Sequence, residues 1–318
     1  MFSGVKNQKS VISHKTGVGH LACFIAYAIF GFNIIVCKDL TRCGEISPMA
    51  LFCLRSIGAG AIFWIIGLFM PSEHIERRDY VKIFFASVLG FFLTQITFLM
   101  AISDITPMDC SIVSSLSPIY TMIIAAIVLH EPITIKKAGG VALSLCGIIY
   151  LILNSVGSGD GVTQTGVGGL VLMILNSLCF SCYLGIFKPT ITKYSVVTFM
   201  KWIFLFSTIM SLPFAVGEVV AIDYRSLPST FVAELAFLIV CSTFITYLLI
   251  PIAQKHIRPT LVSMYSYVQP IIAIAVSISI GMDTLTWQKV LAAVTVFGGV
   301  VLVSYSRSAK DCALPSRK

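Results

Sequence analysis

Charged side chains are scarce in this sequence. Asp, Glu, Lys and Arg together make up 11% of its 318 residues, whereas soluble globular domains usually carry about a quarter. Hydrophobic residues make up 57%, and the mean hydropathy is +0.94. This composition excludes an ordinary soluble domain.

Common motifs of catalysis and cofactor binding are also absent. His130-Glu131 is followed by Pro132-Ile133-Thr134, so it does not form the H-E-x-x-H motif of zinc hydrolases. Neither a phosphate-binding G-x-x-x-x-G-K nor a G-x-S-x-G occurs. The sequence therefore favours a protein that is not an enzyme and that needs no cofactor.

One cysteine spacing suggests a metal or redox site. Cys179 and Cys182 form a C-x-x-C pair, but they lie in the middle of an apolar segment, with no second Cys pair or His near them in sequence. We interpret them as small, membrane-compatible residues on one helix face. No metal site is predicted.

What the sequence does contain is ten separate apolar stretches, each of about 17–23 residues. A helix of roughly 20 residues crosses the hydrocarbon core of a bilayer, where only closed backbone hydrogen bonding is stable. The predicted fold class is an all-α polytopic membrane protein with ten transmembrane helices. The predicted spans are 19–37, 48–70, 80–100, 107–129, 133–153, 166–187, 195–217, 230–250, 257–280 and 286–305.

Lys and Arg residues collect in alternate loops. They precede the first span and follow the second, fourth, sixth, eighth and tenth, whereas the other loops hold only Lys38, Arg42, Arg225 and Lys289. Because cytoplasmic loops carry the excess of positive charge, both termini are predicted to be cytoplasmic, in the cytoplasmic (inner) membrane. The same placement explains the net charge of +8, so nucleic acid is not an expected partner.

Carboxylates are missing from the depth of these spans. Glu131, Glu218, Glu234 and Asp283 all lie within a few residues of span ends. Proton-coupled carriers usually keep an intramembrane carboxylate or His, so the sequence favours facilitated or weakly coupled movement. Glu131 and Asp283 each lie three residues before a Thr that can cap the next helix, and we interpret them as turn and cap residues.

The sequence repeats itself. An offset of 152 residues aligns 101–153 with 253–305, and an offset of 150 pairs Lys38 with Lys188 at the ends of the first and sixth spans. Each copy holds five spans, an odd number, so the second copy must enter the membrane inverted. The identical pairs include Pro107 and Pro259, Ser111 and Ser263, Ser114 and Ser266, Pro118 and Pro270, Thr134 and Thr286, Lys137 and Lys289, and Gly147 and Gly299.

The repeat divides the chain into two halves of similar length. Such halves move about a central site in transporters, exposing it to each side in turn. The predicted parts are a cytoplasmic tail 1–18, a first five-helix repeat 19–153, an external linker 154–165, a second five-helix repeat 166–305 and a cytoplasmic tail 306–318.

Two prolines lie well inside predicted spans. Pro118 and Pro270 each remove a backbone N–H and kink the helix. Polar residues precede both, among them Ser117 and Gln269. Kinks beside hydroxyls and an amide can line a membrane cavity, or they can serve packing with small residues at helix contacts.

Other polar side chains lie within the spans. Arg55 is about 10 Å from the outer end of its helix and must face protein or water. It either orients a negative group of a solute or reaches the outer surface or a loop acid. The remaining candidates for substrate binding, each of which can instead form an interhelical bond, are Asn33, Gln95, Ser117, Asn176, Tyr183, Tyr247, Tyr265 and Gln269.

These motifs together resemble the EamA-type family of the drug/metabolite transporter superfamily, over almost the whole chain. The residues that carry the resemblance are Arg55, Ser117-Pro118, the segment His130 to Thr134, Gly140, Gly147, Gln269-Pro270, Asp283, Thr286 and Gly299. The first span has Phe30-Gly31-Phe32-Asn33 where the family often has Trp-Gly. The resemblance implies ten helices in two inverted repeats that move small organic metabolites, frequently outward.

The sequence thus predicts a membrane transporter of small organic metabolites, an exporter that works by alternating access. Asn33, Gln95, Tyr183 and Gln269 are expected to supply hydrogen bonds to the solute. A multi-span enzyme or a channel without a recognisable motif is the alternative. The expected partners are a small-molecule substrate, the lipid bilayer and a possible second copy of the chain in a homodimer, since the small residues Gly140, Ser144, Thr295 and Gly299 permit close helix packing within or between chains.

Overall fold

The computed structural model describes residues 2–42, 46–129, 135–155, 165–222, 227–282 and 284–304, and this part of the chain is helical throughout, without strands. The first half contains α1 (Phe2–Arg42), α2 (Pro48–Leu68), α3 (Arg77–Ser87), the π-helical turn η1 (Val88–Phe92), α4 (Leu93–Asp104), α5 (Pro107–Ser114), α6 (Ser117–Leu129) and α7 (Ile135–Ser155). The second half contains α8 (Val167–Ile186), α9 (Lys188–Lys193), α10 (Val196–Ala221), α11 (Ser229–Phe237), the π-helical turn η2 (Leu238–Ile245), α12 (Thr246–His256), α13 (Pro259–Met264), the 3₁₀ turn η3 (Tyr265–Tyr267), α14 (Val268–Ser279) and α15 (Trp287–Ser304).

Seven segments of the described chain are long and apolar enough to cross a membrane. They are Thr16–Thr41, Pro48–Leu68, Arg77–Asp104, Val167–Ile186, Val196–Ala221, Ser229–His256 and Pro259–Ser279. Each coincides with a predicted span. Of the other three predicted spans, 107–129 is divided between α5 and α6, while 133–153 and 286–305 correspond to α7 and α15.

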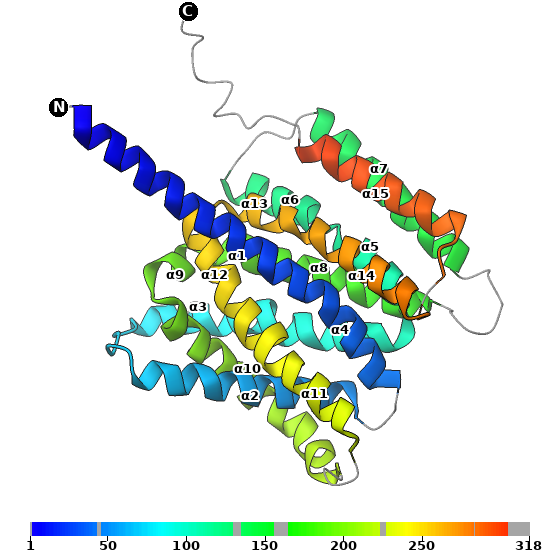
Figure 1. Cartoon of the computed structure of the whole chain (residues 1–318), viewed down its shortest axis with the longest axis horizontal. Helices are drawn as coiled ribbons and strands as arrows, with labels where there is room; N and C mark the ends of the chain where they lie inside the picture. The colour runs from blue at the N-terminus through cyan, green and yellow to red at the C-terminus, as the bar shows by residue number, and fades with distance from the viewer. Residues whose placement is uncertain are drawn as a thin grey trace, which may run out of the picture.

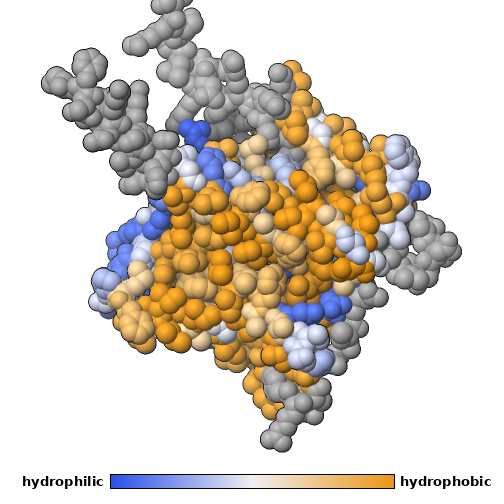
Figure 2. Space-filling view, in the orientation of Figure 1, coloured by the Kyte–Doolittle hydropathy of each residue, from blue (hydrophilic) through white to orange (hydrophobic). Residues whose placement is uncertain are grey.

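The surface agrees with a membrane environment. Figure 2 shows apolar residues over most of the visible face, with hydrophilic residues gathered toward its edges. Large hydrophobic side chains are exposed on many helices, for example Leu21 at 60% and Ile271 at 68%. Exposed apolar patches of this extent are unfavourable in water, and lipid is the solvent that they suit.

The two halves make matching helix contacts. A Cβ atom placed on Gly19 of α1 would lie 3.1 Å from Cβ of His256, and one on Gly169 of α8 would lie 3.1 Å from Cβ of Asp104. The two glycines are 150 residues apart in sequence, and their two partners are 152 apart. The packing of α1 on α12 is therefore reproduced by the packing of α8 on α4.

The lysines paired by the offset of 150, near the end of α1 and just after α8, make similar contacts. Lys38 donates from Nζ to the carbonyl oxygen of Ile102 at 2.8 Å, and Lys188 donates to that of Ile257 at 2.9 Å. In each half a lysine thus bonds a carbonyl near the C-terminus of the third helical segment, where positive charge is favourable. The two carbonyl partners are 155 residues apart, so the lysines have similar contacts but not strictly equivalent ones, and the match at an offset of 150 stays a prediction.

A pair of helices lies at one side of the bundle. α7 and α15 run side by side (Figure 1) and pack mainly on each other. Ser144 donates to the carbonyl oxygen of Val296 at 3.1 Å, and a Cβ on Gly299 would lie 2.5 Å from the carbonyl oxygen of Gly140. Three of the four predicted small residues therefore make a contact within one chain. The hydroxyl of Thr295 bonds its own helix instead. The homodimer stays a prediction.

Candidate functional site

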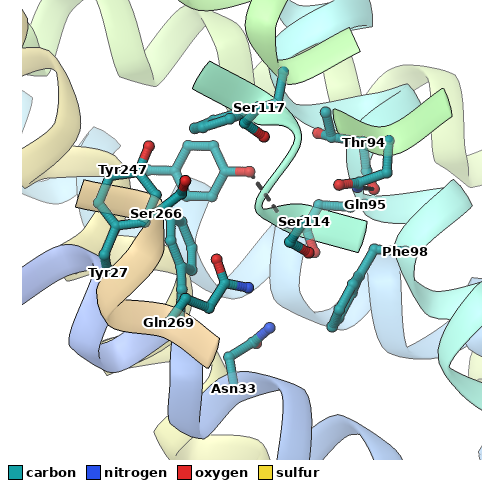
Figure 3. Close-up of a pocket in the computed structure, with 13 residues that line it drawn as sticks. Tyr27, Asn33, Thr94, Gln95, Phe98, Ser114, Ser117, Tyr247, Ser266 and Gln269 are labelled. Atoms are coloured by element: carbon teal, nitrogen blue, oxygen red, sulfur yellow. Dashed lines mark hydrogen bonds between the residues drawn. The ribbon is translucent and has the colours of Figure 1, made fainter. Parts of the chain in front are cut away.

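A cavity lies at the centre of the bundle, where both halves contribute helices. It contains about 550 Å³ of space between atoms, part of which is open to solvent. Figure 3 shows the side chains around it. The lining residues are Tyr27, Phe30 and Asn33 of α1, Thr94, Gln95 and Phe98 of α4, Ser114 of α5, Ser117 of α6, Asn176 and Phe180 of α8, Tyr247 of α12, Ser266 of η3 and Gln269 of α14.

The lining contains five aromatic rings and eight neutral polar side chains, and none of the 13 residues is charged. Small-molecule sites in proteins commonly combine apolar and aromatic walls with a few polar groups that fix orientation. The amides of Asn33 and Gln269 approach the cavity from α1 and α14, with Gln95 and Ser114 across from them (Figure 3). The cavity can therefore hydrogen-bond a small molecule on several sides.

Equivalent positions of the two repeats meet in this lining. Ser114 and Ser266 are 152 residues apart, as are Ser117 and Gln269. Gln95 and its equivalent Tyr247 bond each other directly, from Nε2 to the hydroxyl oxygen at 3.0 Å. Both halves thus build the cavity, the first with eight lining residues and the second with five.

The local backbone explains how these groups reach the cavity. Between α5 and α6 the amides of Ser115 and Leu116 donate to carbonyls three residues back, so the helix tightens for one turn before it restarts at Ser117. Pro118 has no N–H to continue the regular pattern. The η3 turn precedes Pro270 in the same way. The irregular turns lie just before the two prolines, and the serine or glutamine that precedes each proline lines the cavity. The kinks at Pro118 and Pro270 stay predictions.

Hydrogen bonds fix most of the polar groups. The amide of Asn176 donates to the carbonyl oxygen of Thr94 at 2.5 Å. The Oδ1 atom of Asn33 accepts from the hydroxyl of Ser242 at 2.5 Å. The hydroxyl of Tyr247 donates to the carbonyl oxygen of Gly90 at 3.4 Å. These bonds hold three cavity side chains in defined orientations.

Three lining side chains carry a polar atom that is buried and has no hydrogen-bond partner in the described structure. They are the hydroxyls of Tyr27 and Ser266 and the Oε1 atom of Gln95. Tyr27 and Ser266 are each 2% exposed and Gln95 is 7% exposed. A buried polar atom without a partner is costly, and functional sites are one setting where such atoms occur.

Six of the nine residues predicted to bind substrate line this cavity: Asn33, Gln95, Ser117, Asn176, Tyr247 and Gln269. Arg55, Tyr183 and Tyr265 do not. The phenol ring of Tyr183 packs against Gly90 of η1. Tyr265 bonds the ring nitrogen Nδ1 of His20 through its hydroxyl at 2.8 Å and so joins η3 to α1.

Arg55 is fully buried, next to the cavity but outside its lining. Its guanidinium group donates to Thr243 at 2.9 Å, to Ser242 at 3.3 Å and to the sulfur of Cys37 at 3.5 Å. Ser242 in turn donates to Asn33. Arg55 neither reaches the surface nor pairs with a carboxylate among the described residues, so its connection to the cavity runs through Ser242 and Asn33.

Five lining residues were not predicted to bind substrate or line a cavity: Tyr27, Phe30, Thr94, Phe98 and Phe180. Aromatic residues and Thr are common in membrane helices, so their identity alone carried no signal. Spacing could have found Phe30, because it lies three residues before Asn33 and therefore on a neighbouring part of the same helix face. Glu131 and Asp283 lie outside the described residues.

Two polar clusters join the halves at opposite ends of the bundle. At the start of α3, Asp79 accepts from Lys193 and from the hydroxyl of Tyr194, both at 2.6 Å, and from Lys82 at 2.7 Å. The bonds to Asp79 raise the pKa of Lys193. At the start of α5, Asp109 accepts from the hydroxyl of Thr165.

No group of three or more His, Cys, Asp and Glu side chains that could hold a metal ion occurs in the described part of the chain. Cys179 is buried in α8 and Cys182 is partly exposed there, and both are free thiols. The C-x-x-C spacing thus has no further ligand around it among these residues.

Comparison with known proteins points to one family. The profile of the EamA-like transporter family matches residues 17–153 and 167–305, one match for each half. The chain is 23% identical to the uncharacterized transporter YetK of Bacillus subtilis (strain 168), over 96% of this chain and 93% of that protein. It is 25% identical to the S-adenosylmethionine/S-adenosylhomocysteine transporter of Chlamydia muridarum (strain MoPn / Nigg), over 71% of this chain and 73% of that protein.

A solved crystal structure has the same fold. It superposes with a TM-score of 0.63 at 16% identity, over 92% of this chain and 97% of the solved chain. At that identity the likeness concerns the fold alone.

Proposed function

Because the chain belongs to the EamA-like transporter family, we propose that it carries a small organic solute across the cytoplasmic membrane by alternating access between its two repeats. Ten spans in two inverted five-helix repeats, with both termini in the cytoplasm, are the topology that we propose. In this topology α5 and α6 form one interrupted span, and α7 and α15 are two further spans. Export is the proposed direction, in line with what the resemblance of the motifs implies.

One observation carries this proposal: the central cavity is lined by equivalent residues of both repeats. A site shared by two halves can open to either side when the halves exchange their conformations. A channel needs a continuous path with a filter of carbonyls or charged rings, and the lining of this cavity contains neither a charged ring nor a charged residue.

We assign substrate contact to the six predicted residues in the lining, Asn33, Gln95, Ser117, Asn176, Tyr247 and Gln269. Arg55 does not contact the substrate; it affects the site indirectly, because it bonds Ser242, which in turn bonds Asn33. Tyr183 and Tyr265 hold helices beside the cavity. Bending at Pro118 and Pro270 accompanies the exchange between inward and outward access, since helices with interrupted hydrogen bonding bend more easily.

The experiment is transport in proteoliposomes that contain the purified protein. Labelled solutes are loaded inside, and their exit is followed at increasing concentration, with and without a pH gradient. Saturable exit of a solute, inhibited by excess unlabelled solute, is expected of a carrier. Movement that stays proportional to concentration would instead identify a channel. Chemical conversion of the solute without movement would identify an enzyme.

The names of the relatives suggest which solutes to test first. The chlamydial relatives are named as transporters of S-adenosylmethionine and S-adenosylhomocysteine, and both compounds belong in the panel. The relative from Bacillus subtilis is named as a transporter without a substrate.

A further inference from the structure

We propose that the cavity binds an uncharged, planar nitrogen heterocycle that has hydrogen-bond donors and acceptors on its edge, of the kind found in nucleobases and nucleosides. The inference rests on the proposed transport function and names the substrate class of that same site. Three independent properties of the lining lead to it: its lack of charge, its aromatic faces and its unpartnered polar atoms.

The first property is charge. None of the lining residues is charged, and the nearest buried cation, Arg55, directs its guanidinium to Thr243, Ser242 and Cys37. A charged group brought into such a cavity would lose its hydration without gaining an ion pair. A cationic drug or an acidic metabolite therefore fits this lining poorly.

The interruption between α5 and α6 offers little to a carboxylate. Helix starts bind anions through free backbone N–H groups. Here Pro118 has none, and the amides of Ile119 and Tyr120 both donate to the carbonyl oxygen of Leu116. The carboxylate of a zwitterionic amino acid would thus find few amide donors at this point.

The second property is the set of aromatic rings. On one side, the ring of Phe30 stands edge-on to that of Tyr27, with centroids 5.8 Å apart, and to that of Tyr247, at 6.3 Å. Phe98 of α4 and Phe180 of α8 add two rings from other helices. Aromatic rings in this number favour a flat, polarisable molecule that can stack or meet them edge to face.

The third property is the set of free polar atoms. The hydroxyl of Tyr247 donates to Gly90, so it accepts from Nε2 of Gln95 and leaves Oε1 of Gln95 as a free acceptor. The hydroxyls of Tyr27 and Ser266 can each donate or accept. A heterocycle carries N–H donors and ring-nitrogen or carbonyl acceptors on one edge and can pair with such atoms, whereas a hydrocarbon group leaves them without partners.

The experiment uses the full chain in proteoliposomes and counterflow of labelled adenine, uracil, adenosine and uridine, with leucine, glutamate and choline as comparators. Saturable counterflow of at least one heterocycle is expected, with inhibition by the other heterocycles and none by glutamate or choline. The variants Tyr27→Phe and Ser266→Ala remove a free hydroxyl from the cavity. Each is expected to raise the KM for the heterocycle about 5–20-fold.

The chain supplies matched controls. Tyr267 and Ser177 also carry buried hydroxyls without partners in the described structure, but neither lines the cavity. Tyr267→Phe and Ser177→Ala should therefore leave the KM within about twofold, and the melting temperature of each variant in detergent shows whether it is folded. An equal change in KM for cavity and control variants would overturn the assignment of the three free atoms.

The outcomes separate this inference from the function on which it rests. Saturable movement of leucine, glutamate or choline without movement of any heterocycle would overturn the inference and leave the transporter function standing. An absence of saturable movement for every probe, with folded protein in the vesicles, would overturn both.

Discussion

Gln95 donates a hydrogen bond to Tyr247, and these two residues are 152 residues apart, the separation that relates the two repeats. Two other contacts have the same separation: the hydroxyls of Ser56 and Thr208 lie 2.9 Å apart, and Ser144 donates to the carbonyl oxygen of Val296. The two residues of each contact occupy equivalent positions, so a rotation that superposes one repeat on the other exchanges the two residues and preserves the contact. The three contacts therefore mark where the halves meet around their common axis.

A contact that maps onto itself need not break when the two halves exchange conformations, so the bond between Gln95 and Tyr247 should be kept throughout transport. We expect Gln95→Leu and Tyr247→Phe each to destabilise the protein, because each leaves the other polar group buried without its partner. A double-mutant cycle on the free energy of unfolding in mixed micelles should give a coupling of about 0.6–1.7 kcal/mol. Purely additive effects would show that the bond contributes nothing.

Gly90 should tolerate no side chain. A Cβ atom at this position would lie 2.3 Å from the ring carbon Cδ2 of Tyr183. We expect Gly90→Ala to cost about 1–3 kcal/mol, as overpacking usually does. Gly217 in α10 is the control, since nothing lies within 4 Å of a Cβ there, and Gly217→Ala should be neutral or stabilising by up to about 1 kcal/mol. Equal melting temperatures for the two variants would contradict the tight packing of Tyr183 on η1.

Arg55 is expected to act on transport through its bonds and not through its charge alone. An ammonium group cannot reach Thr243, Ser242 and Cys37 together as the guanidinium does. Arg55→Lys should therefore raise the KM for the transported solute several-fold although the charge is kept. Lys201→Met is the control, because Lys201 lies over the ring of Trp64, outside this network. A wild-type KM for Arg55→Lys would show that these bonds of Arg55 do not affect transport.

Asp79 should stabilise the contact between α3 and the residues that precede α10. Its side chain is 3% exposed and accepts three bonds, two of them from lysines. We expect Asp79→Asn to lower the melting temperature by about 2–8 °C, since bonds to a charged acceptor are lost while their donors remain. Lys82, at 59% exposed, provides the control: Lys82→Gln should change the melting temperature by less than about 2 °C. A larger fall in melting temperature for Lys82→Gln than for Asp79→Asn would contradict the stabilising role of Asp79.

Most of the fold could be predicted from the sequence because membrane helices must satisfy their own backbone, and a long apolar run has few other choices. Seven predicted spans coincide with long apolar helices of the described chain. Kinks at Pro118 and Pro270 were predicted because proline cannot continue the hydrogen-bond pattern, and an irregular turn precedes each proline in the structure. The count of ten spans depends on interpreting α5 with α6, α7 and α15 as spans, which length and hydropathy alone do not establish.

The site was predicted less completely, because a sequence does not give the rotation of each helix about its axis. Gln95 and Asn176 were found by being polar within apolar spans. Arg55 was found in the same way, yet its side chain lies behind the lining, where hydroxyls of the π-helical turn η2 bind it. Phe98 and Phe180 were missed because aromatic residues are as common on lipid-facing helix surfaces as around a cavity.

The two π-helical turns, η1 and η2, occupy equivalent places in the two repeats. A π-helical turn accommodates one residue more than regular helix does, and such turns are rare and frequently occur at functional sites. In both turns a backbone carbonyl accepts from a side-chain hydroxyl: Gly90 from Tyr247 and Leu238 from Thr243. Each widened turn thus leaves a main-chain acceptor for a side chain, and that of η1 orients a phenol that lines the cavity.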